Sequence, residues 1–412
     1  MKKASLWLCL IFFAAAQVLG EYVESGNAKY KKGDLDGAIA DYSKAISLDS
    51  GDTLAYGKRG NAKYLKHDLA GAIEDYTKVI ELRPDLADAY NNRGLARQEK
   101  GELGGALADF DRAIKLNPDY ASAYYNRSAA KKDKGDWSGA AADLTKTIEL
   151  DPGNFSAFAR RGLAREKMGN WDGALADDDQ AIKLKPDFAE AYHRRAFTKL
   201  NKGDREGAIT DYTKAIELQP GNFNIYFWRG IAKTRKGDLS GAVADFTKVL
   251  ELKPDDAPAY SSRSNAERAQ GDLDKAIADC DRAIELNPNY APAYNNRGWS
   301  EFLKNDFDNA IADANRAIQL DPQNANAYGT RGWARYSKGD VTGGLEDCKK
   351  AVELKGDGLA TAAFDQGMVY FINGNYHKAV DSWQKSIHHD AAGQRDLEAW
   401  IEKAKAQQSS GK

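Results

Sequence analysis

Apolar and small residues recur along the chain at fixed places within a period of 34 residues. When Ala87 is counted as position 1 of one period, these residues occupy positions 4, 8, 20, 24 and 27. Positions 4, 8 and 11 share one face of an α-helix, and positions 20, 24 and 27 share one face of a following helix. The pattern therefore predicts two amphipathic helices in each period and an all-α fold.

Turn residues mark the ends of these helices with the same period. Glycine at position 15, such as Gly101, permits the turn that ends the first helix. The acidic residue after it, as in Gly203-Asp204, suits the start of the second helix. Proline at position 32 cannot continue a helix and ends the second one. Eight prolines hold this place: Pro84, Pro118, Pro152, Pro186, Pro220, Pro254, Pro288 and Pro322. The chain is therefore an array of one small unit.

The unit from Ala87 to Tyr120 resembles the tetratricopeptide repeat, a helix–turn–helix unit of 34 residues. The signature positions are held by Tyr90, Gly94, Ala106, Phe110, Ala113 and Pro118. Position 8 is small in all eleven copies: Gly26, Gly60, Gly94, Ser128, Gly162, Ala196, Gly230, Ser264, Gly298, Gly332 and Gly367. The resemblance implies a right-handed α-solenoid of about eleven repeats, with approximate bounds 19–52, 53–86, 87–120, 121–154, 155–188, 189–222, 223–256, 257–290, 291–324, 325–358 and 360–393.

The residues before the first repeat have the features of a secretory signal peptide. Lys2 and Lys3 precede an apolar run over residues 6–16, and small-residue cleavage patterns end at Ala16 and Gly20. We expect cleavage after Gly20, which makes residues 1–20 the signal peptide. The mature protein is then exported, periplasmic or secreted, with no membrane association. An uncleaved anchor is the alternative, although the run is shorter than the roughly 20 residues of a membrane span.

A further helix follows the last repeat. Leu397, Trp400, Ile401 and Ala404 mark one face of a helix over residues 394–406. A solenoid needs an end that covers its last core and turns charge to water, so we expect this helix to cap the array. Residues 407–412 are expected to form a flexible tail.

Two ladders of opposite charge run through the repeats. Position 7 is Arg in nine consecutive repeats: Arg59, Arg93, Arg127, Arg161, Arg195, Arg229, Arg263, Arg297 and Arg331. Position 23 is Asp in ten: Asp41, Asp75, Asp109, Asp143, Asp177, Asp211, Asp245, Asp279, Asp313 and Asp347. We expect each Arg to pair with an Asp of its own or the preceding repeat, because the two ladders cancel in charge. A basic stripe for a polyanion is the alternative interpretation.

Composition adds little that favours other functions. With 59 Lys and Arg against 61 Asp and Glu, the net charge is −2, which gives no reason to expect nucleic acid as a partner. Cys280 and Cys348 both occupy position 24, two repeats apart. That separation is too large for a disulfide, so we expect two buried free thiols.

We find no motif of an enzyme or a cofactor site. The chain has no phosphate-binding glycine loop and no metalloprotease motif. His377, His388, His389 and Asp390 cluster near the end, but their spacing matches no metal-ligand pattern. We therefore expect no catalytic residue, no metal and no cofactor. A metal-dependent enzyme stays an alternative only if this histidine cluster binds metal.

The resemblance also implies where a partner binds. In tetratricopeptide repeat proteins the first helices line a concave groove, chiefly through positions 2, 5, 6, 9, 12 and 13. The polar candidates at these positions are Asn61, Asn92, Asn126, Arg160 and Arg194. The aromatic candidates are Phe197, Phe227, Trp228, Trp299, Phe302, Trp333 and Tyr336. Aromatic and Arg side chains are enriched in interface hot spots, so we expect Trp228, Trp299 and Trp333 to be partly exposed and to bind the ligand. Packing of these rings into the core is the alternative.

The leading hypothesis is a non-enzymatic, exported scaffold that binds a peptide or protein in the concave groove. The second is an assembly factor or accessory subunit of an envelope enzyme complex, which acts by docking. Partner identity, pathway and oligomeric state are left open by the sequence.

Overall fold

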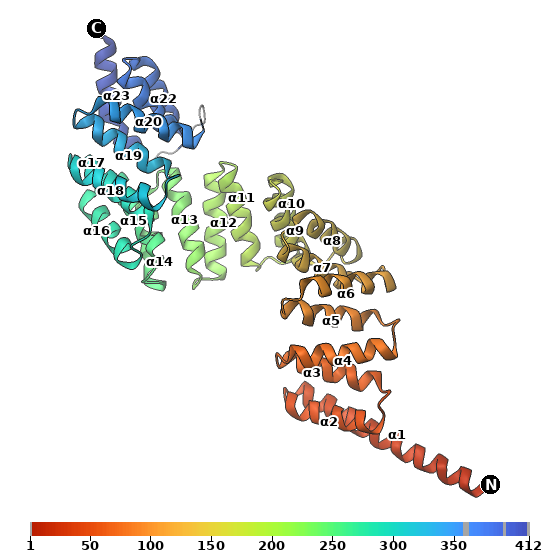
Figure 1. The fold of residues 1–412 in the computed structure, drawn as a ribbon. Coiled ribbons are helices and arrows are strands. Elements are labelled where there is room, and N and C mark those ends of the chain that lie inside the picture. Colours follow the sequence, from red (N-terminus) through yellow and green to blue (C-terminus); the bar gives the residue numbers. More distant parts are fainter. Residues whose placement is uncertain (1, 357–361, 390–392, 410–412) are drawn as a thin grey trace. The chain divides into compact units, whose positions relative to one another are not determined.

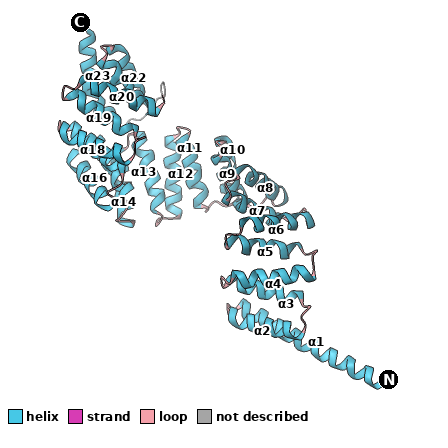
Figure 2. Ribbon diagram, viewed as in Figure 1, coloured by secondary structure: helices cyan, strands magenta, loops and turns pink. Residues whose placement is uncertain are grey.

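The computed structural model describes residues 2–356, 362–389 and 393–409. These residues form 23 helices, and no strand occurs among them (Figure 2). The chain divides into two units, residues 1–186 (unit 1) and 187–412 (unit 2). The all-α solenoid architecture expected from the 34-residue period is confirmed.

Unit 1 is built from ten helices, coloured red to olive in Figure 1. They are α1 (Lys2–Lys31), α2 (Leu35–Leu48), α3 (Thr53–Leu65), α4 (Leu69–Leu82), α5 (Ala87–Glu99), α6 (Leu103–Leu116), α7 (Ala121–Asp133), α8 (Trp137–Leu150), α9 (Phe155–Lys167) and α10 (Trp171–Leu184). Each helix packs against the next, and the first helices of successive repeats also contact one another. The helix α1 runs without a break from the predicted signal peptide into the first repeat. Within the described residues, no helix is both long and apolar enough to span a membrane.

Unit 2 contains the remaining helices. They are α11 (Ala189–Asn201), α12 (Arg205–Leu218), α13 (Phe223–Lys236), α14 (Leu239–Leu252), α15 (Ala257–Gln270), α16 (Leu273–Leu286), α17 (Ala291–Leu303), α18 (Phe307–Leu320), α19 (Ala325–Ser337), α20 (Val341–Lys355), α21 (Ala363–Ile372), α22 (Tyr376–His389) and α23 (Gln394–Ser409). The odd-numbered helices from α11 to α21 are the first helices of their repeats. The last of all, α23, packs against α22 and also reaches α15.

The residue at position 15, where the first helix ends, has a left-handed backbone conformation in every repeat. Nine repeats have glycine there, for example Gly101 at a φ of 88°. His67 and Asn305 hold the same position in two other repeats, at φ values of 60° and 63°. Asn tolerates this conformation better than most residues because its short side chain bonds locally. The turn geometry of the repeat is therefore kept even where glycine is replaced.

In several repeats the core closes where a small residue at position 8 meets an aromatic ring at position 24. A Cβ atom added to Gly94 would lie only 2.7 Å from the ring of Phe110, which is itself fully buried. The alanine at position 20, such as Ala106, is also buried. Cys280 and Cys348 take the place of the ring in two repeats as buried free thiols, as expected.

The two charge ladders pair, as predicted, and in the nine repeats that carry the Arg the paired Asp belongs to the same repeat. Every Arg at position 7 donates two hydrogen bonds to the carboxylate of the Asp sixteen residues later. The donor–acceptor distances are 2.5–2.8 Å for Nη2 and 2.7–3.0 Å for Nε. The remaining nitrogen, Nη1, bonds the preceding repeat in most cases, as Arg93 does with Thr77 at 3.1 Å. The aspartates are buried. The ladders thus set the register of helices within and between repeats.

A third ladder at position 11 completes these ion pairs in eight repeats. The Lys or Arg at this position lies 2.6–3.0 Å from the same Asp. In repeats 8 and 9, position 11 carries a Glu instead of a Lys or Arg. Glu267 therefore faces Asp279, and Glu301 faces Asp313. One oxygen of each Glu, Oε2, is buried without a hydrogen-bond partner among the described residues. Burial, and then the neighbouring Asp, raises the pKa of both glutamic acids to about 7.

We expect this reversal to make stability fall as the pH rises. The ordinary pKa of Glu is 4.5, so between about pH 5 and pH 7 the folded state holds protons that the unfolded state releases. Each Glu can contribute at most about 1.4 kcal/mol per pH unit in this window. The double variant Glu267→Lys/Glu301→Lys restores the common ladder and should remove the effect.

The test compares thermal unfolding midpoints of both proteins at pH 5.5 and pH 7.5. The charges facing Glu267 are Arg263, Asp279, Lys275 and Asp272, and all of them are left unchanged in the variant. The wild-type midpoint should drop more between the two pH values than the midpoint of the variant. Equal pH dependence of the two proteins would contradict the assignment.

Candidate functional site

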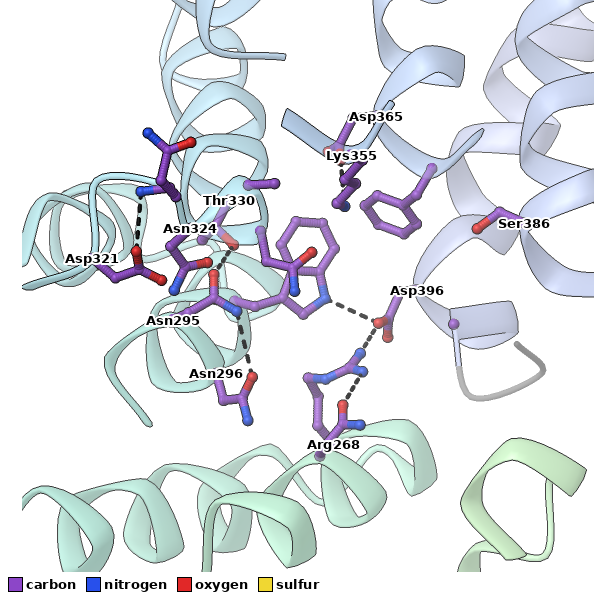
Figure 3. A pocket seen from close by; sticks show the side chains of 17 residues that line it. Arg268, Asn295, Asn296, Asp321, Asn324, Thr330, Lys355, Asp365, Ser386 and Asp396 are labelled. Carbon is purple, nitrogen blue, oxygen red and sulfur yellow. Dashed lines mark hydrogen bonds and ion pairs between the residues drawn. The ribbon is translucent and has the colours of Figure 1, made fainter. Parts of the chain in front are cut away.

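A recess with a volume of about 690 Å³ lies beside the first helices α15, α17 and α19 of unit 2 (Figure 3). It is lined by Asn265, Arg268, Asn295, Asn296, Trp299, Asp321, Gln323, Asn324, Ala325, Asn326, Thr330, Lys355, Phe364, Asp365, Ser386, Gly393 and Asp396. Several of these residues hold positions 2, 5, 6, 9 or 12 of their repeats, the positions that the resemblance assigns to a partner. We call this recess the amide pocket.

Carboxamide side chains dominate the wall of the amide pocket. Thr330 Oγ1 donates to Asn295 Oδ1 at 2.9 Å, and Asn296 Nδ2 donates to the carbonyl oxygen of Ser261 at 3.1 Å. Asn326 is exposed at the mouth. An Asn side chain carries two N–H donors and a carbonyl acceptor, which match the acceptor and donor of a peptide group. Part of this capacity is used within the wall, because Asn295 and Asn296 already bond Thr330 and Ser261.

Two buried ion pairs set the charge of the amide pocket. Lys355 Nζ lies 2.7 Å from Asp365 Oδ2, and the aspartate is almost fully buried. Arg268 pairs with Asp396, which also accepts a hydrogen bond of 3.0 Å from the indole nitrogen of Trp299. Figure 3 shows both pairs pointing into the same recess. Because each cation has its own carboxylate, the site does not present a net charge that would select an anion.

The helix α23 contacts the first helices α15, α17, α19 and α21. Asp396 contacts α15 through Arg268 and α17 through Trp299. The ring of Trp400 lies 5.1 Å from that of Trp333 on α19 and 5.5 Å from that of Phe371 on α21. Five residues at positions 9 and 12 of the first helices form what we call the first-helix surface: Arg268, Trp299, Trp333, Tyr336 and Phe371. We expected α23 only to cap the array; it packs on α22 and also covers this surface.

The expected exposure of the C-terminal aromatic residues is wrong. Trp299, Phe302 and Trp333 retain 8%, 5% and 0% of their exposed area. Tyr336 is half-buried and packs beside Phe371 and Trp400. These rings do not fill positions 4, 8 or 11 of their repeats. They are buried together with the apolar face of α23, where Leu397 and Ala404 are fully buried as well.

The other aromatic candidates, Phe197, Phe227 and Trp228, are half-buried. The partial exposure expected of Trp228 is therefore confirmed. Phe197 and Phe227 both meet the ring of Trp228 edge-on, with centroids 5.1 Å and 5.9 Å away. Arg194, in contrast, is buried and lies 3.6 Å from Glu190, so it is not a free groove cation. The first-helix face near α11 and α13 thus presents a small aromatic patch.

Two of the polar candidates of unit 1 line a second recess, whereas Asn126 and Arg160 lie on α7 and α9 and do not line it. Asn61 and Asn92 both line a cavity of about 400 Å³ between α3, α4 and α5. Asn61 accepts a hydrogen bond of 2.8 Å from Tyr76, and Asn126 donates one of 2.9 Å to Asn91. Arg160 is exposed and stacks over the ring of Tyr125 at 4.2 Å.

The histidine cluster offers little as a metal site in the described residues. His377 pairs with Asp381 at 3.0 Å on an exposed face, and His388 is exposed. Asp390 and the side chain of His389 lie outside the described part of the chain. Among the residues that are described, no three His, Cys, Asp or Glu side chains come together as ligands.

Sequence reasoning missed the polar residues that form the amide pocket. Asn295, Asn296 and Asn326 sit at groove positions, and that signal was visible beside the aromatic residues. Lys355, Asp365 and Asp396 had no signal, because they come from the end of α20, the start of α21 and the start of α23. Only the folded chain brings them together.

Comparison with known proteins agrees with the helical pairs and their period. Models described as tetratricopeptide repeat match residues 87–120, 125–189, 235–291, 262–325 and 295–358, and a model described as TPR repeat matches 26–67, 60–101 and 199–237. No curated protein sequence matches.

Solved structures that resemble this chain are numerous. One is a tetratricopeptide repeat protein from Parabacteroides merdae, 20% identical, which covers 61% of this chain and 98% of its own with a TM-score of 0.54. The MamA protein is 31% identical over 42% of this chain and 96% of its own, with a TM-score of 0.39. Yeast Tom70 is 16% identical over 96% of this chain and 97% of its own, with a TM-score of 0.46. On the matches of the family models along its length, the chain belongs to the tetratricopeptide repeat family.

Proposed function

We propose that the protein is an exported, non-enzymatic scaffold that binds a peptide or protein segment at the amide pocket of unit 2. The observation that carries this proposal is the wall of carboxamides at groove positions of successive first helices. Neutral amides recognise a peptide backbone without requiring one particular sequence, and the nearby Trp299 and Phe364 supply apolar contact. Tetratricopeptide repeat proteins generally serve as protein-interaction scaffolds without enzymatic activity, which supports the same assignment.

Export is part of the proposal and rests on the N-terminal sequence. Lys2, Lys3 and the apolar run over residues 6–16 have the order of a signal peptide. A partner would then be met outside the cytoplasm.

Blocking the amide pocket is expected to weaken partner capture about tenfold or more, the loss that follows from about 1.4 kcal/mol of binding free energy. Asn326→Arg places a long side chain among the residues that line the pocket, at a position where Asn326 is exposed. The matched control is Asn289→Arg, on an exposed loop between α16 and α17. Each protein is used as bait in a native extract, and recovered proteins are quantified by mass spectrometry. Recovery of every captured protein by both variants alike would contradict the assignment of the pocket.

A further inference from the structure

The first turn of α23 is held by polar contacts to two repeats that lie far back along the chain. Asp396 is buried between the guanidinium of Arg268 and the indole N–H of Trp299. Arg395 donates to the carbonyl oxygen of Gln270, the last residue of α15. These contacts join α23 to repeats 8 and 9, not to the final repeat that precedes it.

The following turns are held by an apolar face. Leu397, Trp400, Ile401 and Ala404 point to one side, and all but the half-buried Trp400 are buried. Trp400 contacts Trp333, Tyr336 and Phe371 at centroid distances of 5.1, 6.2 and 5.5 Å. The opposite side, with Glu398, Glu402 and Lys405, is exposed. This is the spacing with which an amphipathic helix fills a groove of another protein.

The helices beneath α23 have other packing partners as well. Arg268, Trp299, Trp333 and Phe371 sit on first helices that pack against the second helices of their own and of the preceding repeats. Because α23 follows all other described helices, its departure separates no other pair of them. It would uncover two tryptophans and an arginine, the residue types that dominate interface hot spots. A free surface of this kind would be a binding site, and the chain fills it with its own terminal segment.

We propose that α23 is a built-in occupant of the first-helix surface, which an amphipathic helix of a partner protein displaces. The partner helix carries an acidic residue for Arg268 and Trp299. Apolar residues follow at the offsets of Leu397, Trp400, Ile401 and Ala404, with an aromatic ring in the place of Trp400. This inference rests on the proposed scaffold function. It names the class of partner, a protein whose amphipathic helix has the chemistry of α23 and binds next to the peptide segment in the amide pocket. Asp396 borders both sites, so release of α23 also opens one wall of that pocket.

The experiment loosens α23 in the full chain and supplies the same helix in trans. The probe is a fluorescently labelled synthetic peptide of residues 393–409, and binding is followed by anisotropy. In the variant Asp396→Ala/Trp400→Ala, the first-helix surface is intact but its occupant has lost its main contacts. We expect this variant to bind the peptide at least about tenfold more tightly than the wild type. A peptide that carries the same two substitutions is the matched control and should not bind.

A second arm leaves every contact of α23 unchanged. A protease site is inserted after Gly393 in the full chain, and cleavage then leaves α23 held by non-covalent contacts alone. The cleaved protein should exchange its α23 for the labelled peptide, whereas the uncleaved protein should not.

Three results would overturn the proposal. Cleaved protein that keeps α23 and takes up no peptide would show a permanent structural helix. Loss of helical circular dichroism far beyond one helix, in the variant or after cleavage, would show that α23 is needed for folding. Dimers that trade α23 between copies would make a second copy, and not a partner, the occupant. Failure of the proposed scaffold function would give a different result. Asn326→Arg would then capture partners as well as the wild type does, independently of how the labelled peptide binds.

Discussion

Replacing Trp333 with alanine is expected to destabilise unit 2 by about 3–5 kcal/mol, the usual cost of removing a buried aromatic side chain. Trp333 is fully buried, and its ring meets those of Trp299, Phe364, Trp383 and Trp400 at centroid distances of 5.0–5.9 Å. Its indole nitrogen has no hydrogen-bond partner among the described residues. Trp333→Phe should therefore cost much less than Trp333→Ala, because it keeps most of the ring contacts and removes an unsatisfied donor.

The measurement is urea unfolding followed by circular dichroism, with local hydrogen exchange because long repeat arrays need not unfold in one step. The matched control is Trp228→Ala, since Trp228 is only half-buried and packs at the edge of a core cluster, beside Phe197 and Phe227. The control should lose clearly less stability. If Trp333→Ala unfolds at the same urea concentration as the wild type, the ring does not belong to the core described above.

The second large effect is expected at Arg263. Its guanidinium holds Asp279 with bonds of 2.7 Å and 2.8 Å, and the third member of the cluster is Glu267 in place of a cation. Arg263→Ala leaves two buried carboxyl groups facing each other with their closest cation gone, which typically costs about 3–5 kcal/mol. Arg195→Ala should cost less, because Lys199 still lies 2.7 Å from Asp211.

The two alanine variants are compared by urea unfolding at pH 7.5, with Arg195→Leu as a further control. Leucine fills part of the space that alanine leaves empty, so Arg195→Leu should be milder than Arg195→Ala. A larger loss for Arg195→Ala than for Arg263→Ala would contradict the role assigned to the position 11 ladder.

The repeat period made most of the fold predictable. Once the 34-residue frame is known, Arg59 and Asp75 must lie on facing helices sixteen residues apart, and they do. The turn at position 15 is equally local, and even His67 and Asn305 obey it. Such features depend on neighbours within one or two repeats, which the sequence pattern encodes directly.

The contents of the site were harder to predict because they depend on distant segments. The apolar face of residues 394–406 indicated a helix that buries Leu397 and Trp400, but amphipathicity does not say which surface receives it. Trp299 and Trp333 looked free because their own repeats leave them uncovered. A helix much later in the chain covers them, and Asp396 at its start follows Trp299 by 97 positions.

Hydrogen–deuterium exchange of the intact protein, read by mass spectrometry, tests the central claim most directly. If α23 occupies the first-helix surface, peptides from residues 394–409 should be protected from exchange to the same order as those from α22. Peptides that contain Trp299 and Trp333 should lose protection in Asp396→Ala/Trp400→Ala, while those from α3 to α6 in unit 1 stay unchanged. Rapid exchange throughout residues 394–409 of the wild type, with α17 and α19 still protected, would contradict it.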